Sequence, residues 1–229
     1  MIRAVGVAVP AHDEEDLLPL SLAAIRRAAG MLAATPVHIV VVADACADRT
    51  AQLARDSGAT VVEIRARNVG AARQAGMREL LRRLGHLDPA EVWLATTDAD
   101  TLVPPGWLSQ QLRHAGQGWE AVIGTVTVTD WTEHPAEVPP LFRQRYGNGG
   151  GSHLHVHGAN LGFSAKAYLA AGGFGLRRTA EDHALVAALE RAGSRVLRTT
   201  QVSVVTSARR RARAPQGFSH LLSTLARTD

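Results

Sequence analysis

The amino-terminal part of the chain alternates short apolar runs with segments of helical periodicity, and this alternation restricts the folds open to it. Strands that alternate with helices form parallel sheets, because each crossover returns the chain to the same end of the sheet. In the first helical segment, Leu18, Leu22 and Ile25 recur at helical spacing. The strands are predicted at residues 4–9, 37–43, 60–64 and 92–97, with further helices at 48–57 and 71–84. We therefore expect an α/β fold with a mostly parallel central sheet flanked by helices.

The alternation becomes less regular after Asp100. Residues 135–151 are rich in proline and glycine, so we predict a mobile loop there. The 229 residues, 46% hydrophobic and 20% charged, suit a single packed domain. The elements expected in this half are helices at 106–114, from 165 and at 181–192, and strands at 121–129, 156–163, 195–199 and 202–206.

Charge and aromatic content argue against a nucleic-acid partner. The formal net charge is +4, and Lys166 is the only lysine, so the basic side chains are otherwise arginines. Aromatic residues make up only 4% of the chain, whereas nucleic-acid grooves combine basic side chains with stacking aromatic ones. A phosphate-bearing small molecule is the better expectation.

Cysteine and hydropathy patterns narrow the class further. Cys46 is the only cysteine, so it cannot form an internal disulfide, and without a second thiol it is not expected to anchor a cysteine-based zinc site. No apolar run approaches the roughly 18 residues that cross a bilayer, and the amino terminus lacks a signal-peptide pattern. We expect a cytoplasmic chain with no transmembrane segment.

Carboxylates follow three of the predicted strands. In open α/β sheets, ligands bind beyond the carboxyl ends of the strands. Asp13 and Glu14 follow the first strand, Asp44 follows the second, and Asp98 and Asp100 follow the fourth. Three acidic clusters at one sheet edge indicate a bound cation and sugar hydroxyls.

Asp98 and Asp100 are candidate metal ligands. Carboxylates two residues apart at a strand end can face one site, and they supply the hard oxygen ligands that Mg²⁺ or Mn²⁺ prefers. Such a cation would hold a diphosphate. The alternative is a polar turn before Pro104 and Pro105, in which the aspartates accept backbone N–H bonds.

Asp44 and Arg73 are candidate nucleotide contacts. A carboxylate at Asp44 can accept the imino N–H that uracil and guanine carry and adenine lacks. Arg73 can bind phosphate or base, although a solvated arginine on the predicted helix is an equal alternative. Asp48 is interpreted as a helix cap.

Thr179, Glu181 and Asp182 precede a helix with an apolar face. One interpretation is a capping box, in which Thr179 caps the helix. The other is a carboxylate, held ionised at the helix amino terminus, that takes a proton from an acceptor hydroxyl. The capping box would stabilise only the start of the helix, whereas the proton-accepting carboxylate would take part in catalysis.

Two basic groups lie in the second half of the chain. His153, His155 and His157 alternate, so on a strand they share one face, and we favour a polar acceptor pocket over a zinc or iron site there. The arginine run that includes Arg209 and Arg211 is either a solvated loop or a lid over phosphates or an anionic acceptor.

Taken together and in order, these motifs resemble those of the family 2 glycosyltransferases with the nucleotide-diphospho-sugar transferase fold, called GT-A. The resemblance covers nearly the whole chain. The matching segments are PAHDE at 10–14 for P-x-x-N-E, ADACADRT at 43–50 for D-x-S-x-D-x-T, ARQAG at 72–76 for A-R-N-x-G, TTDAD at 96–100 for D-x-D, and then G-x-N at 158–160, G-G-F at 172–174 and E-D at 181–182.

The resemblance implies a metal-dependent hexosyltransferase that moves a sugar, with inversion, from a UDP- or GDP-linked donor to a hydroxyl acceptor. Mg²⁺ or Mn²⁺ would be held by Asp100 with help from Asp98 and would stabilise the leaving diphosphate. Asp182 would deprotonate the acceptor, with Glu181 as the reserve candidate. The single domain would divide into a nucleotide-sugar-binding half, 1–100, and an acceptor half, 101–229.

The resemblance also implies binding residues. The donor site would comprise Pro10, Ala11, His12 and Asp44 around the nucleobase, with Arg73 beside it, Glu14 on the ribose and Asp98 at the diphosphate. The acceptor site would comprise His155, His157, Asn160, Arg209 and Arg211. Two departures stand out: Ser164 replaces the basic residue usual four positions after the asparagine, and no later histidine lies near residues 206–209 to complete the metal shell.

Two other classes compete with this interpretation. A nucleotidyltransferase on a similar sheet needs a Gly-rich phosphate loop with a basic residue after the first strand, where this chain has acids. A non-catalytic sugar-nucleotide binding module tolerates loss of the E-D pair, which this chain keeps at Glu181 and Asp182. Both features favour a transferase.

Overall fold

The computed structural model describes residues 1–32, 34–146, 151, 153–209 and 222. Its strands are β1 (Ala4–Ala11), β2 (Val37–Asp44), β3 (Thr60–Ile64), β4 (Val92–Thr96), β5 (Thr101–Leu102), β6 (Ala121–Thr127), β7 (Leu161–Ser164) and β8 (Val196–Thr206). Its helices are α1 (Leu18–Gly30), α2 (Thr50–Asp56), α3 (Val69–Leu84), α4 (Trp107–Gly116), α5 (Val138–Tyr146), α6 (Ala165–Ala170) and α7 (Glu181–Arg191), with single 3₁₀ turns η1 (Pro89–Glu91) and η2 (Gly158–Asn160).

All eight strands of the described chain form one sheet in the order β3-β2-β1-β4-β7-β6-β8-β5. The neighbours among β1 to β4 pair in parallel, as the alternation in the sequence predicts. β7 runs antiparallel between β4 and β6, while β6 and β8 pair in parallel. The two predicted halves of the chain therefore share one sheet, and the expected α/β class is confirmed.

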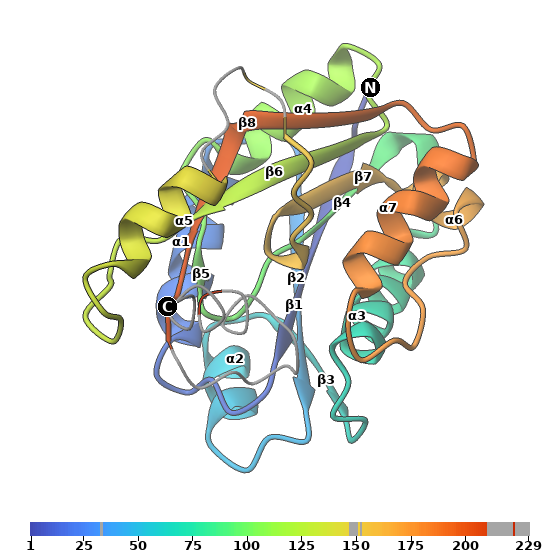
Figure 1. Ribbon diagram of the computed structural model, residues 1–229. Coiled ribbons are helices and arrows are strands. Elements are labelled where there is room, and N and C mark those ends of the chain that lie inside the picture. The colour runs from blue at the N-terminus through green and yellow to red at the C-terminus, as the bar shows by residue number, and fades with distance from the viewer. Residues whose placement is uncertain (33, 147–150, 152, 210–221, 223–229) are drawn as a thin grey trace.

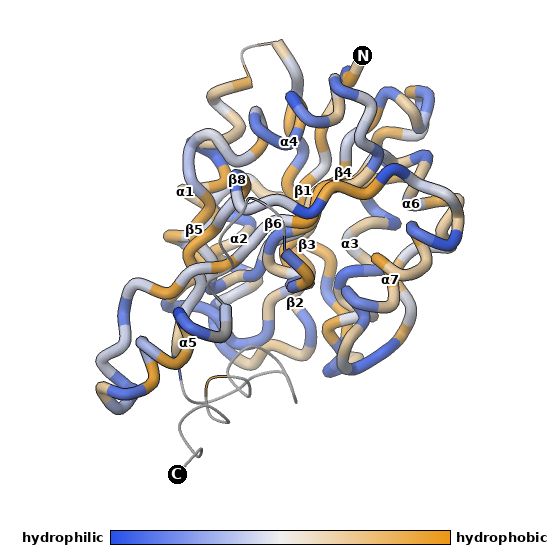
Figure 2. Tube along the Cα trace, turned by 45° about the horizontal axis from the view of Figure 1, so that its top comes forward, coloured by the Kyte–Doolittle hydropathy of each residue, from blue (hydrophilic) through white to orange (hydrophobic). Residues whose placement is uncertain are grey.

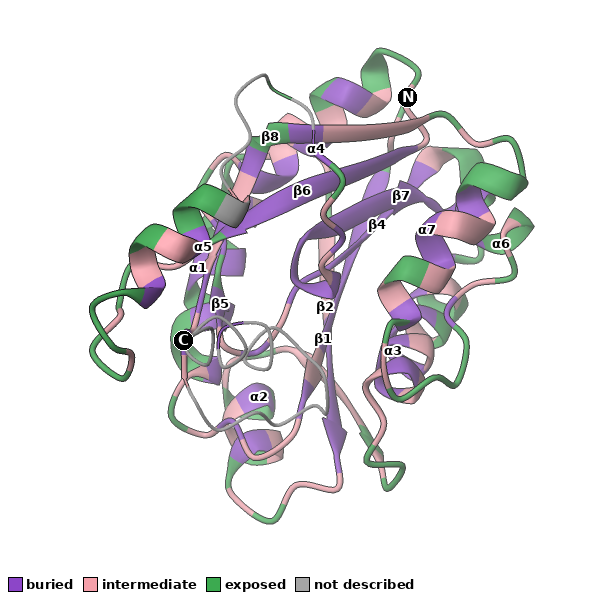
Figure 3. Cartoon of the chain, viewed as in Figure 1, coloured by how far each residue is buried: buried purple, intermediate pink, exposed green. Residues whose placement is uncertain are grey.

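Helices cover both faces of the sheet (Figure 1). α1, α2 and α4 pack on one face through a core that includes Leu22, Ile25 and Trp107. α3, α6 and α7 pack on the other through a core that includes Leu80 and Leu189. Figure 2 shows hydrophobic stretches along the strands, and Figure 3 shows that β1, β4, β6 and β7 are largely buried. No helix in the described part of the chain has the length and apolar content to cross a bilayer.

α3 lies close against the sheet, and this places its first turns at the sheet edge where ligands are expected. A Cβ atom at Gly76 would lie 3.0 Å from Ala8 Cβ and 3.1 Å from a methyl group of Val42, so a glycine is needed for this close approach. The helix begins after Asn68, whose side chain accepts a hydrogen bond from Ala71 N at 3.1 Å.

Several expectations for the second half are wrong. Residues 138–146 of the predicted mobile loop form α5, because prolines fit the first turn of a helix and Val138 and Phe142 pack in a small apolar cluster. Residues 147–150 of that loop lie outside the described residues. The strand predicted at 156–163 is shorter in the structure. It begins only at Leu161, as β7, since the chain before Leu161 pairs with no described strand. The two predicted strands at 195–206 form the single strand β8.

Candidate active site

A cleft of about 620 Å³ lies at the carboxyl ends of β1, β2 and β4. The segments that follow these strands line it, together with residues 156–159, 178–183 and 206–209 and the start of α3. The acidic clusters predicted to share one edge of the sheet therefore do converge. The predicted site residues that line the cleft are Pro10, Ala11, His12, Glu14, Asp44, Arg73, Asp98, Asp100, His157, Glu181, Asp182 and Arg209.

Arg73 is a buried side chain that connects Asp98, after β4, to Glu181, at the start of α7. Its side chain is only 3% exposed, and its guanidinium lies 2.5 Å from Asp98 Oδ1 and 2.9 Å from Glu181 Oε1. Burial disfavours the charge, but the two carboxylates outweigh it and raise the pKa of Arg73. The interpretation of Arg73 as a solvated arginine on the helix surface is therefore wrong. In the structure its guanidinium is bound to two protein carboxylates.

Gly158 makes room for this arginine. A Cβ atom at Gly158 would lie 2.3 Å from Arg73 Nη2, well inside contact distance. The Gly158 N–H also donates to Asp182 Oδ2 at 2.8 Å. The glycine of the G-x-N motif thus supports both Arg73 and the candidate base.

Asp182 lies at the start of α7, but the capping-box interpretation is wrong. The N-cap is Ala180, in the left-handed region at φ 55°, and it makes no side-chain cap bond. Asp182 Oδ2 is anchored by Gly158, and Oδ1 accepts from His183 N at 2.8 Å. Since each carboxylate oxygen has two lone pairs, Asp182 keeps acceptor capacity toward the cleft.

Glu181, the reserve candidate, has a different environment. It is 5% exposed and bound to Arg73. Burial raises its pKa, and the Arg73 charge opposes that shift. Its carboxylate is committed to an internal ion pair, so Asp182 is the better placed of the two to meet an acceptor.

Asp100 is paired with Arg209 rather than facing open solvent. Arg209 Nη2 lies 2.9 Å from Asp100 Oδ2, and the same guanidinium donates to both oxygens of Glu14 at 2.8 and 2.6 Å. Burial raises the pKa of Asp100 to about 7, the Asp98 and Glu14 charges act in the same direction, and Arg209 opposes them. The structure thus places Arg209 against Glu14 and Asp100, in the same cleft as Asp182, and its assignment to the acceptor side stays a prediction.

The carboxylate of Asp44 holds the loop before α3. Its Oδ1 accepts from Ala66 N at 2.7 Å and Arg67 N at 2.8 Å, and its Oδ2 accepts from Asn68 N at 2.7 Å. Three of about four lone-pair positions are therefore used by backbone donors. Asp44 also lines the cleft.

The histidines line up although they are not on a strand. The rings of His153 and His155, and of His155 and His157, stack with centroids 6.1 and 6.2 Å apart, and none of the three belongs to the group of described residues whose potential ligand atoms lie within 4.8 Å of one another. His155 also stacks on Tyr146 at 4.0 Å. Burial lowers the pKa of His157 to about 4, so the ring facing the cleft is neutral at neutral pH.

Two predicted acceptor residues are not brought to the cleft. His155 packs against Tyr146, and Asn160 is 1% exposed. The Asn160 amide donates to Thr125 O and Val202 O and accepts from Trp107 Nε1, so it holds β6, β8 and α4 together. Arg211 lies outside the described residues.

The cleft also contains residues that the sequence did not single out, among them Arg178 and His183 on either side of the E-D pair. No spacing signal marks them, because a lone arginine and a lone histidine near a helix start are common surface residues. The sequence feature that could have indicated them is their position close to Glu181 and Asp182.

The match to family models agrees with this arrangement. The model described as Glycosyl transferase family 2 matches residues 6–182, which include every acidic cluster of the cleft. The chain belongs to this family. It is a glycosyltransferase with the GT-A fold. Comparison with curated protein sequences gives no match.

Solved structures support the same fold for this family 2 glycosyltransferase. A mycobacterial protein matches with a TM-score of 0.61 at 21% identity, over 98% of this chain and 71% of that one. Glucosyl-3-phosphoglycerate synthase from M. tuberculosis, in complex with Mn²⁺, UDP and glucosyl-3-phosphoglycerate, matches with 0.61 at 19%, over 98% and 76%. TarS from S. aureus, in complex with UDP-GlcNAc, matches with 0.66 at 12%, over 93% and 60%.

Proposed function

We propose that this glycosyltransferase transfers a sugar with inversion from a UDP- or GDP-linked donor to a hydroxyl acceptor, and that a divalent cation assists. The observation that carries the proposal is the convergence of Asp44, the Asp98–Asp100 pair and Asp182 on one cleft. In this proposal Asp44 meets the nucleobase, the Asp98–Asp100 pair the cation and diphosphate, and Asp182 the acceptor. A single displacement at the sugar carbon by an acceptor oxygen inverts its configuration.

The cation site is proposed at Asp100, with Asp98 beside it. Carboxylate oxygens suit Mg²⁺ or Mn²⁺, and Mg²⁺ takes its other ligands from waters and substrate phosphates. When bound, the cation supplies positive charge to the leaving diphosphate. The neighbours crystallised with Mn²⁺ and UDP support this choice.

Asp182 is proposed as the base that accepts the proton of the acceptor hydroxyl. Gly158 N fixes one of its oxygens at the start of α7, and the other side of the carboxylate can accept a proton from a hydroxyl in the cleft. The neutral ring of His157 lies beside it in the cleft and offers a polar contact to a sugar or another hydroxyl acceptor.

Donor turnover separates this proposal from its alternatives. We expect purified protein with Mn²⁺ to hydrolyse one UDP- or GDP-sugar of a panel slowly in the absence of acceptor, releasing UDP or GDP. A non-catalytic binding module would bind a nucleotide sugar without releasing nucleotide. A nucleotidyltransferase would instead form a nucleotide sugar from a nucleoside triphosphate and a sugar phosphate.

Arg209 is expected to compete with the cation for Asp100, because its guanidinium already pairs with that carboxylate. Removing the guanidinium removes the positive charge that repels a cation at this position and frees the Asp100 oxygen that it occupies. We expect Arg209→Ala to bind Mn²⁺ at least about tenfold more tightly than wild type without nucleotide, measured by electron paramagnetic resonance titration. Arg198→Ala is the matched control, since Arg198 pairs with Glu190 away from the cleft. Unchanged or weaker Mn²⁺ binding by Arg209→Ala would contradict the competition.

A further inference from the structure

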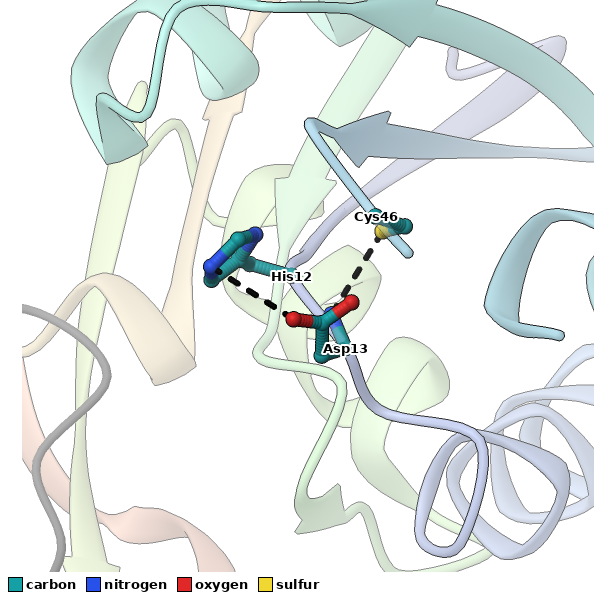
Figure 4. A group of neighbouring side chains, drawn as sticks. All are labelled: His12, Asp13 and Cys46. Carbon is teal, nitrogen blue, oxygen red and sulfur yellow. Dashed lines mark hydrogen bonds and ion pairs between the residues drawn. The ribbon is translucent and has the colours of Figure 1, made fainter. Parts of the chain in front are cut away.

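A second group of potential metal ligands lies beside the cleft, in the loops that follow β1 and β2. His12, Asp13 and Cys46 each offer one ligand atom, and these atoms lie within 4.8 Å of one another. Among the described residues, no other group of three or more histidine, cysteine, aspartate or glutamate side chains has ligand atoms this close together. β1 and β2 are parallel neighbours that pair as far as Ala11 and Ala43, so both loops leave the sheet side by side. Figure 4 shows the three side chains converging.

The orientation of His12 suits a metal ligand. Its Nδ1 lies 2.6 Å from the carbonyl oxygen of Asp44, so the proton of the neutral ring belongs on Nδ1. The lone pair of Nε2 then faces Asp13 Oδ2 at 3.8 Å. A backbone carbonyl that fixes the tautomer in this way is the usual support of a histidine that binds a metal.

Asp13 and Cys46 are held toward the same point. Asp13 Oδ1 accepts from Ala47 N at 2.7 Å, which leaves Oδ2 on the side of His12. Asp13 N donates to Cys46 Sγ at 3.4 Å, so the sulfur is held against the same turn. The side chains of His12 and Asp13 are 33% and 37% exposed, which gives an ion access from solvent.

We propose that His12 Nε2, Asp13 Oδ2 and Cys46 Sγ bind a divalent cation of the zinc class, with a fourth position open to water. One nitrogen, one oxygen and one sulfur ligand match the preferences of Zn²⁺ and disfavour Mg²⁺, which requires oxygen ligands. Zinc bonds of about 2.0–2.3 Å place tetrahedral ligand atoms roughly 3.3–3.8 Å apart. The described ligand atoms lie within 4.8 Å of one another, so metal binding would draw them closer together. Binding displaces the thiol proton of Cys46 to solvent.

This site differs from the one proposed at Asp100 in both chemistry and place. Its ion would cross-link the loops after β1 and β2, while Asp100 follows β4. His12 and Asp44 both line the cleft, and they are joined by the bond from the His12 ring. Occupancy of the site would therefore fix the wall of the cleft on the side proposed for the nucleobase.

Cobalt substitution tests the proposal without any nucleotide, so the outcome is independent of the transferase activity. Co²⁺ has ligand preferences close to those of Zn²⁺ and is coloured. We expect one equivalent of Co²⁺ to produce a thiolate-to-cobalt charge-transfer band and intense tetrahedral d–d bands, both removed by one equivalent of Zn²⁺. Excess Mg²⁺ should leave both bands unchanged.

Three variants and one control assign the ligands. Cys46→Ser is expected to lose the charge-transfer band, and His12→Ala and Asp13→Asn to weaken Co²⁺ binding at least about tenfold. His86→Ala removes an exposed histidine in the turn after α3 and should bind Co²⁺ as wild type does. Circular dichroism checks that each variant is folded. Wild-type protein without a charge-transfer band, or a band that survives in Cys46→Ser, would overturn the proposal.

Discussion

Asp182→Asn is expected to lower turnover roughly 10²- to 10⁴-fold while donor affinity stays near that of wild type. Asparagine cannot take the proton of the acceptor hydroxyl. It can keep one oxygen for Gly158 N or His183 N, so the loss of one backbone bond should cost about 1 kcal/mol of stability. The measurements are the turnover number with a saturating acceptor, nucleotide binding by calorimetry and thermal unfolding.

Glu190→Gln is the matched control for this substitution. Glu190 is a carboxylate on the same helix, paired with Arg198 and outside the cleft, so its loss should change neither turnover nor donor binding. Near wild-type turnover by Asp182→Asn would refute the base assignment and move it to Glu181 or His157. Glu181→Gln is expected to cost less turnover than Asp182→Asn.

Asp100→Asn is expected to abolish the part of UDP or GDP affinity that depends on Mn²⁺ or Mg²⁺. The neutral amide is a poor ligand for a hard cation, and loss of several kcal/mol of leaving-group stabilisation should lower turnover by roughly 10³-fold or more. Calorimetry with and without Mn²⁺ measures the first effect directly. In wild type the cation should strengthen nucleotide binding, and in the variant the two affinities should coincide.

The control for Asp100→Asn is Asp56→Asn at the exposed end of α2, where Asp56 accepts a hydrogen bond from Gln52 of the same helix. It should keep the full metal effect. If Asp100→Asn responded to Mn²⁺ as strongly as wild type does, the cation would have to be placed elsewhere in the cleft.

Local sequence patterns predicted the parallel half of the sheet well. The valine-rich runs and helical spacings of residues 4–96 depend on neighbours in sequence, and β1 to β4 follow them closely. The second half depends on pairing between distant segments. β7, for example, joins β4 to β6 and is only four residues long, so its hydrophobic signal is weak. Proline content misled the prediction at α5, where the prolines occupy the first turn.

The carboxylates of the site were predictable, and their partners were not. Asp44, Asp98 and Asp100 could be placed because the carboxyl ends of parallel strands meet at one edge. The arginines that bind them come from far away in the chain: Arg73 is 108 positions from Glu181, and Arg209 is 195 positions from Glu14. No periodicity links positions so distant. The thiol count predicted no cysteine-based zinc site at Cys46, and it carried no information on the histidine and aspartate that folding brings beside this cysteine.

The buried guanidinium of Arg73 connects the proposed donor and acceptor sides of the cleft. The guanidinium forms one ion pair with Asp98, beside the proposed diphosphate position, and a second with Glu181, next to the proposed base. A ligand that draws Asp98 toward itself strengthens the hold of Arg73 on Glu181 and stiffens the start of α7. Linkage requires the reverse effect to be equal, so an acceptor that favours this state of α7 must also tighten donor binding by the same factor. With the proposed roles of Asp98 and Asp182, we therefore expect donor and acceptor to bind cooperatively through the arginine that pairs with Asp98 and Glu181.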